Sequence, residues 1–134
     1  MKRTIRLTAT IPAKPAVVYA AWLDGKQHSA MTGEKATSQA RVGGKFTAWD
    51  GYISGTHLEL KPGKEIVQAW RSTEFPDDAP DSLLEVRFEA APRGTKLTLI
   101  HSEIPDGQAE SYAQGWREFY FAPMKKFFAA QKAK

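Results

Sequence analysis

Turn signals that contain glycine recur at short intervals in the middle of this chain, and they constrain its fold more than any other feature. The signals are Gly43-Gly44, Asp50-Gly51, Ser54-Gly55 and Pro62-Gly63. Glycine adopts backbone angles that other residues avoid, so each pair marks a turn or a bulge between short extended segments. The middle of the chain is therefore predicted to be a curved antiparallel meander.

Alternating hydrophobic and polar residues extend the sheet on both sides of this meander. Residues 4–11 alternate cleanly, which is typical of a half-buried strand, and Leu84, Val86 and Phe88 share one face of a later strand. Extended segments are predicted at 4–11, 34–41, 45–50, 52–61, 64–73, 82–91 and 95–103. The sequence thus predicts a sheet of about six to seven strands.

Two short helices are expected directly after the first strand. Pro15 fits the first turn of a helix that continues to Trp22, because proline lacks the N–H that this turn leaves unpaired. Asp24 can cap a second helix that ends near Gly33. The longest helix candidate in the chain is residues 108–131.

The C-terminal helix candidate carries an aromatic face. At about 100° per residue, its large side chains fall on one arc that is expected to face the sheet. The residues on this arc are Tyr112, Trp116, Phe119, Tyr120, Pro123, Met124 and Phe127. Phe121 and Phe128 fall at its margin, where a short helix, a ligand or a partner protein is expected to cover them. Pro123 should bend or locally break the helix.

These elements predict an α+β fold in which a curved antiparallel sheet wraps around the C-terminal helix and encloses a cavity. The residues most specific to this arrangement are Gly-Gly-Lys-Phe at 43–46, Asp50-Gly51, Ser54-Gly55, Ile66-Val67, Trp70, Gln114-Gly115-Trp116 and Tyr120-Phe121. From Ile5 to about Phe128, the chain resembles the family named for the C-terminal domain of the activator of the heat-shock-protein-90 ATPase. That family belongs to the START-like, helix-grip (SRPBCC) superfamily. The resemblance implies one helix-grip domain over residues 1–134.

The composition is that of an ordinary globular protein. Hydrophobic residues make up 42% of the 134 residues and charged residues 25%. No apolar run approaches the roughly 20 residues that span a bilayer, and no signal-peptide apolar region follows the basic N-terminus. A cytoplasmic location without membrane contact is therefore expected. The absence of cysteine excludes disulfides, thiol catalysis and cysteine metal sites.

The formal net charge of +4 raises the question of a nucleic-acid partner. The basic residues are scattered, and no recognition-helix, zinc-finger or RNA-binding motif accompanies them, so no nucleic acid is expected. No metal or other cofactor is expected either. His28, His57 and His101 lack a second ligand at helical spacing, and the aspartates at 77, 78 and 81 match no calcium loop.

Large aromatic residues are the strongest indication of a binding site. They are Trp22, Phe46, Trp49, Trp70, Phe88, Trp116 and Tyr120. Each alone could simply fill the core, but together on a curved sheet and its helix they are expected to line a space that they do not fill. Ligand pockets are mostly apolar with a few oriented polar groups. The predicted cavity residues are Trp22, Phe46, Gln68, Trp70, Phe88, His101, Trp116 and Tyr120.

Three functions follow from this sequence, and non-catalytic binding of a small hydrophobic ligand in the cavity is preferred. The second hypothesis follows from the resemblance: a co-chaperone-like domain that stimulates a heat-shock-protein-90 type ATPase. Stimulation should be weak, because the family's full activator has a further N-terminal domain for its main chaperone contact. The third is a cyclase-like or hydrolase-like enzyme that depends on His101, Glu103 or Tyr120 facing the cavity. No catalytic residue is assigned, since no nucleophile has a plausible partner.

Overall fold

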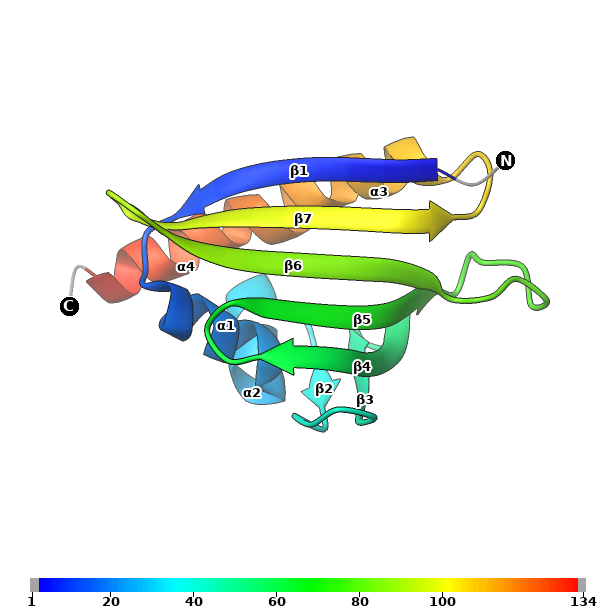
Figure 1. Ribbon diagram of the computed structural model, residues 1–134, viewed down its shortest axis with the longest axis horizontal. Coiled ribbons are helices and arrows are strands. Elements are labelled where there is room, and N and C mark those ends of the chain that lie inside the picture. The colour runs from blue at the N-terminus through cyan, green and yellow to red at the C-terminus, as the bar shows by residue number, and fades with distance from the viewer. Residues whose placement is uncertain (1–2, 133–134) are drawn as a thin grey trace.

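The computed structural model describes residues 3–132, which form one curved seven-stranded sheet and a helical layer behind it (Figure 1). The strands are β1 (Arg3–Ile11), β2 (Thr37–Ser38), β3 (Lys45–Ala48), β4 (Ile53–Lys61), β5 (Glu65–Ser72), β6 (Ser82–Ala91) and β7 (Gly94–Ile104). The helices are α1 (Pro15–Leu23), α2 (Gly25–Thr32), α3 (Ala109–Gly115), the π-helix η1 (Trp116–Phe121) and α4 (Ala122–Lys132).

All neighbouring strands are antiparallel, in the order β1-β7-β6-β5-β4-β3-β2. This confirms the predicted helix-grip arrangement, with two short helices after the first strand and a long helical segment at the C-terminus. Within the described residues, β2 is shorter than the predicted strand at 34–41. The strand predicted at 45–50 ends at Ala48, because Trp49 and Asp50 adopt left-handed backbone angles with φ of 54° and 55°.

Local signals set the ends of the two short helices as predicted. Pro15 occupies the first turn of α1. The Asp24 side chain caps α2 by accepting a hydrogen bond from the Gln27 backbone N–H at 2.8 Å. Gly33 ends α2 with φ at 87°, a conformation that favours glycine.

A close approach within the meander explains a second glycine. A side chain at Gly55 would place its Cβ 1.8 Å from the Ala69 carbonyl oxygen and 2.7 Å from the Phe46 ring. Glycine therefore allows β4 to lie against β5 while the Phe46 ring packs over its backbone.

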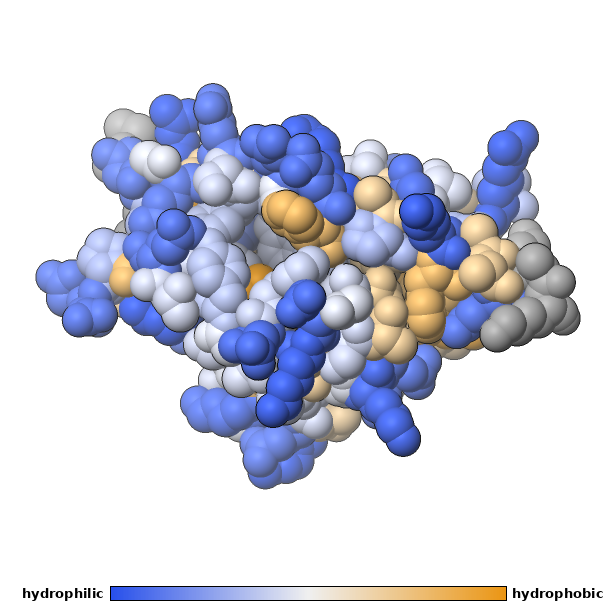
Figure 2. Space-filling model, turned by 180° about the vertical axis from the view of Figure 1, so that it is seen from behind, coloured by the Kyte–Doolittle hydropathy of each residue, from blue (hydrophilic) through white to orange (hydrophobic). Residues whose placement is uncertain are grey.

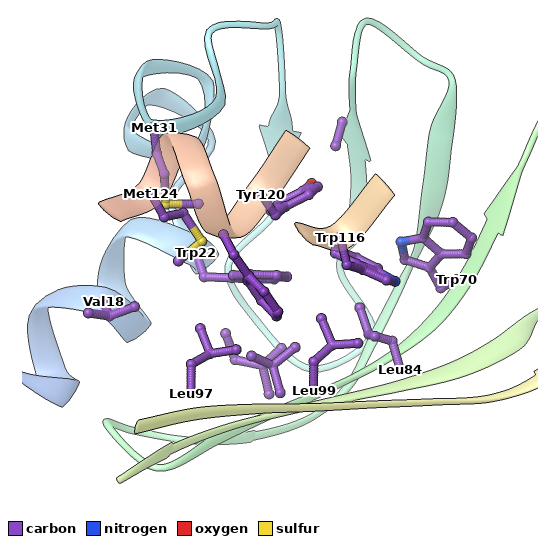
Figure 3. Close-up of a cluster of buried hydrophobic side chains, with 14 of the residues drawn as sticks. Val18, Trp22, Met31, Trp70, Leu84, Leu97, Leu99, Trp116, Tyr120 and Met124 are labelled. Carbon is purple, nitrogen blue, oxygen red and sulfur yellow. The ribbon is translucent and has the colours of Figure 1, made fainter. Parts of the chain in front are cut away.

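The core lies between the concave face of the sheet and the helices. Figure 3 shows Leu84, Leu97 and Leu99 directed from the sheet toward Trp22 and Trp116. All five side chains are buried. Burying large aliphatic and aromatic side chains contributes roughly 1.5–3 kcal/mol each, so this layer is the main source of stability.

The C-terminal helical segment departs from a regular α-helix just before Pro123, as the sequence predicts. Pro123 has no N–H to donate to the turn before it, and the Ala122 N–H bonds five residues back, to the Arg117 carbonyl. The wider turn shifts the buried face by one residue. The predicted arc is therefore wrong at Phe119, which is 53% exposed.

Phe121 and Phe128, expected at the margin of that arc, are instead part of the core at 5% and 2% exposure. The helix α4 packs against α2 and β1, so elements of this chain cover this side of the helix. No ligand or partner is needed to shield these two rings.

Candidate functional site

A pocket of about 370 Å³ opens between the turn that joins β3 to β4 and the helical segment formed by α3 and η1. Figure 2 shows a hollow on the helix side of the molecule, with hydrophobic side chains at its edge. The lining residues are Trp49, Tyr52, Ile53, Trp70, Ser111, Tyr112, Gly115, Trp116, Phe119 and Tyr120. Most are aromatic, and none is charged.

A strained turn places Trp49 over one side of the pocket. Positive φ is unfavourable for a bulky residue, and such conformations are concentrated at functional sites. The turn is held by hydrogen bonds from the Asp50 N–H to the Lys35 carbonyl at 2.9 Å and from the Tyr52 N–H to the Trp49 carbonyl at 3.1 Å. The Trp49 ring then meets Phe119 edge to face, with centroids 5.5 Å apart and planes at 67°.

Gly115, Trp116 and Tyr120 form another part of the pocket wall. Trp116 and Tyr120 lie with ring centroids 4.7 Å apart, and Trp116 also packs against Trp70 at 5.7 Å. Gly115 has ordinary α-helical backbone angles. A Cβ at this position would meet only the Phe119 ring, at a normal contact distance of 3.8 Å. Packing therefore does not require glycine here, and its missing side chain leaves the pocket wider.

Tyrosine hydroxyls at the pocket are engaged by neighbouring groups. Tyr52 donates to the Glu74 carboxylate. Tyr112 donates to Gln108 Oε1 at 2.6 Å and accepts from Ser72 Oγ at 2.5 Å. Burial, reinforced by the hydrogen bond to Glu74, raises the pKa of Tyr52 to about 12, so the phenol stays neutral at physiological pH.

Polar side chains gather around a second, much smaller void of about 10 Å³ deeper in the core. This volume is near the lower limit for one water molecule. His28 Nδ1 donates to the Trp22 carbonyl at 2.8 Å, because a carbonyl can only accept, and Tyr120 donates to His28 Nε2 at 2.8 Å. Burial lowers the pKa of His28 and raises that of Tyr120. Both groups are therefore neutral at physiological pH.

His57 is the second histidine at this void. Its Nε2 lies 2.9 Å from Ser38 Oγ, and its Nδ1 lies 3.4 Å from Gln68 Nε2. Burial lowers the pKa of His57, and the nearby His28 lowers it further. The void is thus walled by aromatic rings and by neutral hydrogen-bonding groups.

His101 has a structural position beneath the tryptophans. Trp116 Nε1 donates to His101 Nδ1 at 3.2 Å, so Nε2 carries the proton and donates to Ser82 Oγ at 2.8 Å. Burial lowers the pKa of His101 to about 3. Glu103, the other acid–base candidate on this strand, does not face the cavity together with His101, because a bulge gives Glu103 a φ of 60° and leaves it exposed. The enzyme hypothesis loses this acid–base pair.

Comparison with known protein families gives a match over residues 12–129 to the family "Activator of Hsp90 ATPase homolog 1-like protein". The chain belongs to this family. It is 32% identical over 124 residues to the human protein "Activator of 90 kDa heat shock protein ATPase homolog 1", covering 92% of this chain and 36% of that protein. A homologue from Dictyostelium discoideum is 25% identical over 128 residues, covering 95% of this chain and 33% of its own length. The chain thus spans about a third of these curated relatives.

Solved structures show the same fold as this member of the Hsp90-activator-like family. A crystal structure of an HSP90 activator from Plasmodium falciparum has a TM-score of 0.82 at 24% identity and covers 96% of both chains. A protein from Chromobacterium violaceum has a TM-score of 0.70 at 29% identity, covering 94% of this chain and 95% of its own. Within residues 3–132, no helix is long and apolar enough to cross a membrane.

Most of the cavity residues predicted from the sequence of this family member lie close together in the structure. Six of them surround the small inner void: Trp22, Phe46, Gln68, Trp70, Trp116 and Tyr120. Trp70, Trp116 and Tyr120 also line the larger pocket. Phe88 and His101 line neither space. Phe88 packs edge to face on Tyr19 with centroids 5.7 Å apart, and His101 lies against Trp70.

Several lining residues carry no signal in the sequence that assigns them to a site. Tyr52, Ser111 and Tyr112 reach the pocket only through the approach of the β3–β4 turn to α3. Trp49 belongs to the aromatic set in the sequence, but its strained turn is a feature of the folded chain. No cluster of three or more potential metal ligands occurs within the described part of the chain.

Proposed function

We propose that this chain binds a chaperone of the Hsp90 type and stimulates its ATPase activity. The observation that carries the proposal is the family match over residues 12–129, together with 32% identity to the human activator across 92% of this chain. Among the three hypotheses from the sequence, this one has more support than ligand binding. The cytoplasmic location predicted from the sequence would place the chain beside cytoplasmic chaperones of this type.

Exposed aliphatic side chains offer a surface on which to test the proposal. Val42 is 61% exposed and Leu58 is 42% exposed. Their segments are joined by a hydrogen bond from the Gly43 N–H to the His57 carbonyl at 2.7 Å. Exposed apolar side chains are positions at which a partner contact can be tested by substitution. This face is separate from the pocket lining.

The test is the steady-state ATPase rate of the organism's own Hsp90-type chaperone with increasing amounts of this chain. A saturable rise, abolished by an inhibitor of the chaperone ATPase, is expected. The double variant Val42→Ser with Leu58→Ser should raise the concentration needed for half-maximal stimulation. Val17→Ser alters a similarly exposed valine on α1 and is the matched control. An unchanged rate, with no binding by titration calorimetry, would contradict the proposal.

The pocket supports a second candidate function, the binding of a small hydrophobic molecule. Its volume of about 370 Å³ falls in the range of ligand pockets, and its walls are apolar. Burying about 200 Å² of apolar ligand surface contributes roughly 5 kcal/mol before ordering costs are subtracted. Because roughly 5 kcal/mol corresponds to a Kd of about 0.2 mM, affinities in the submillimolar to millimolar range are expected once ordering costs are subtracted.

Amide NMR spectra of labelled protein test this second function. Shifts confined to Trp49, Trp70, Trp116 and their neighbours, on addition of pooled hydrophobic compounds, would support it. Spectra that do not change would remove it and leave the chaperone proposal untouched, because the two experiments use separate readouts.

A further inference from the structure

The pocket is walled by aromatic rings whose orientations are fixed by their own contacts. Trp70 meets Tyr112 edge to face, with centroids 5.1 Å apart and planes at 81°. Trp49 and Phe119, which also line the pocket, form a second edge-to-face pair. Aromatic pairs in offset-stacked or edge-to-face geometry gain attraction beyond that of the apolar area they bury. Walls of this kind therefore favour a flat aromatic guest over a flexible aliphatic chain.

The charge of the lining limits the guest further. None of the pocket residues carries a formal charge, and an ion that entered would lose hydration without gaining a counter-charge. The hydroxyls of Tyr52, Tyr112 and Tyr120 are each engaged by another side chain. Ser111 lines the pocket and makes no side-chain hydrogen bond to the described residues. Its hydroxyl can meet one polar substituent on an otherwise apolar molecule.

The size of the pocket sets the size of the guest. A protein cavity of about 150 Å³ holds one benzene ring. The volume of about 370 Å³ here is therefore suited to two or three fused rings. The glycine at position 115 also points to a bound molecule. Glycine in a helix costs stability, and the local packing would accept a methyl group, so packing alone does not account for glycine at this position.

We propose that the pocket binds a neutral, planar aromatic molecule of two or three fused rings, with one hydroxyl-like substituent directed at Ser111. The rings lie between Trp49 and Phe119 on one side and Trp70 and Trp116 on the other. Gly115 provides the space for one ring edge. The proposal rests on the second candidate function and specifies its ligand class.

The experiment compares two probes of equal carbon skeleton on the full chain. The first is 2-naphthol, and the second is decahydro-2-naphthol, its saturated counterpart. Binding is followed by amide NMR shifts, and affinities are compared at neutral pH. We expect 2-naphthol to bind roughly 2- to 12-fold more tightly, the range that one favourable ring pair would give.

Two substitutions on neighbouring helical residues locate the site. Gly115→Leu fills the pocket and should weaken 2-naphthol binding by about tenfold or more. Gln114→Leu places the same side chain on an exposed position outside the lining and should leave the affinity within about twofold. If Gly115→Leu fails to unfold cooperatively, Gly115→Ala replaces it, with a loss of about threefold expected.

The outcomes separate the ligand class from the underlying function. Equal or tighter binding of decahydro-2-naphthol would overturn the aromatic class while leaving hydrophobic binding intact. Tighter binding of tetramethylammonium than of 2-naphthol would overturn the neutral class, since ring faces also attract cations. Full affinity in the pocket-filling variant would overturn the site. No binding of either 2-naphthol or decahydro-2-naphthol at millimolar concentration would overturn both this inference and the second candidate function.

Discussion

The Tyr120 hydroxyl donates a hydrogen bond of 2.8 Å to His28 Nε2 and so joins the π-helical turn to α2 across 92 residues of sequence. His28 completes the link by donating to the Trp22 carbonyl at the end of α1. Three helical segments that pack above the sheet are thereby connected through one neutral imidazole. Because all three side chains are buried, water cannot replace either bond without entering the core.

Removal of the Tyr120 hydroxyl should therefore destabilise the fold. In Tyr120→Phe, the buried His28 Nε2 loses its donor, and an unsatisfied buried acceptor costs about 1–3 kcal/mol. Urea unfolding measures the free energy of unfolding. Tyr52→Phe is the matched control, because its hydroxyl lies on the exposed rim and should change that free energy by less than about 0.5 kcal/mol. Equal losses in the two variants would contradict this account.

Stability should fall as the pH decreases below about 6.5, because buried histidines keep their neutral forms. Burial lowers the pKa of His101 to about 3 and lowers those of His28 and His57 in the folded state. The unfolded chain thus binds more protons than the folded chain between the two pKa values. Each such histidine removes about 1.4 kcal/mol per pH unit within that interval.

Urea unfolding between pH 5 and pH 8 measures this dependence. The slope should be near zero above pH 7 and steep below pH 6.5. A His101→Gln variant should be less stable at pH 8 but should show a shallower loss below pH 6.5, since one of the titrating groups is gone. An unchanged slope in that variant would mean that His101 does not contribute to the pH dependence.

Glycine substitutions at two positions should have opposite effects on stability. Gly115→Ala should stabilise the fold by about 0.5–1 kcal/mol, because the site is helical and the added methyl group meets no close atom. Gly55→Ala should destabilise it, because the new Cβ would lie 1.8 Å from the Ala69 carbonyl oxygen. Thermal unfolding of both variants checks the difference, and a loss of stability in Gly115→Ala would show that glycine is required by packing.

The sequence predicts the fold well because the governing signals are local. Alternation marks β1 and β6, Asp24 caps α2, and glycine pairs mark the turns, so each can be found within a few residues. The candidate site is less predictable. The contact between His28 and Tyr120 joins residues that are 92 positions apart in the sequence. Trp49 adopts a left-handed backbone conformation although it is neither glycine nor asparagine, so its residue type does not predict this turn. The sequence predicts both Gln68 and His101 as cavity residues, but only Gln68 lines one of the two spaces.

The π-helical turn can be tested by two phenylalanines that a regular helix would place differently. A uniform α-helix puts Phe119 on the aromatic arc toward the sheet and Phe121 at its margin, whereas the structure leaves Phe119 53% exposed and Phe121 only 5% exposed. Phe121→Ala should therefore cost about 3–5 kcal/mol of unfolding free energy, and Phe119→Ala less than about 1 kcal/mol. Urea unfolding of both variants gives the comparison. A larger loss in Phe119→Ala would mean that the helix continues through this segment without the wider turn.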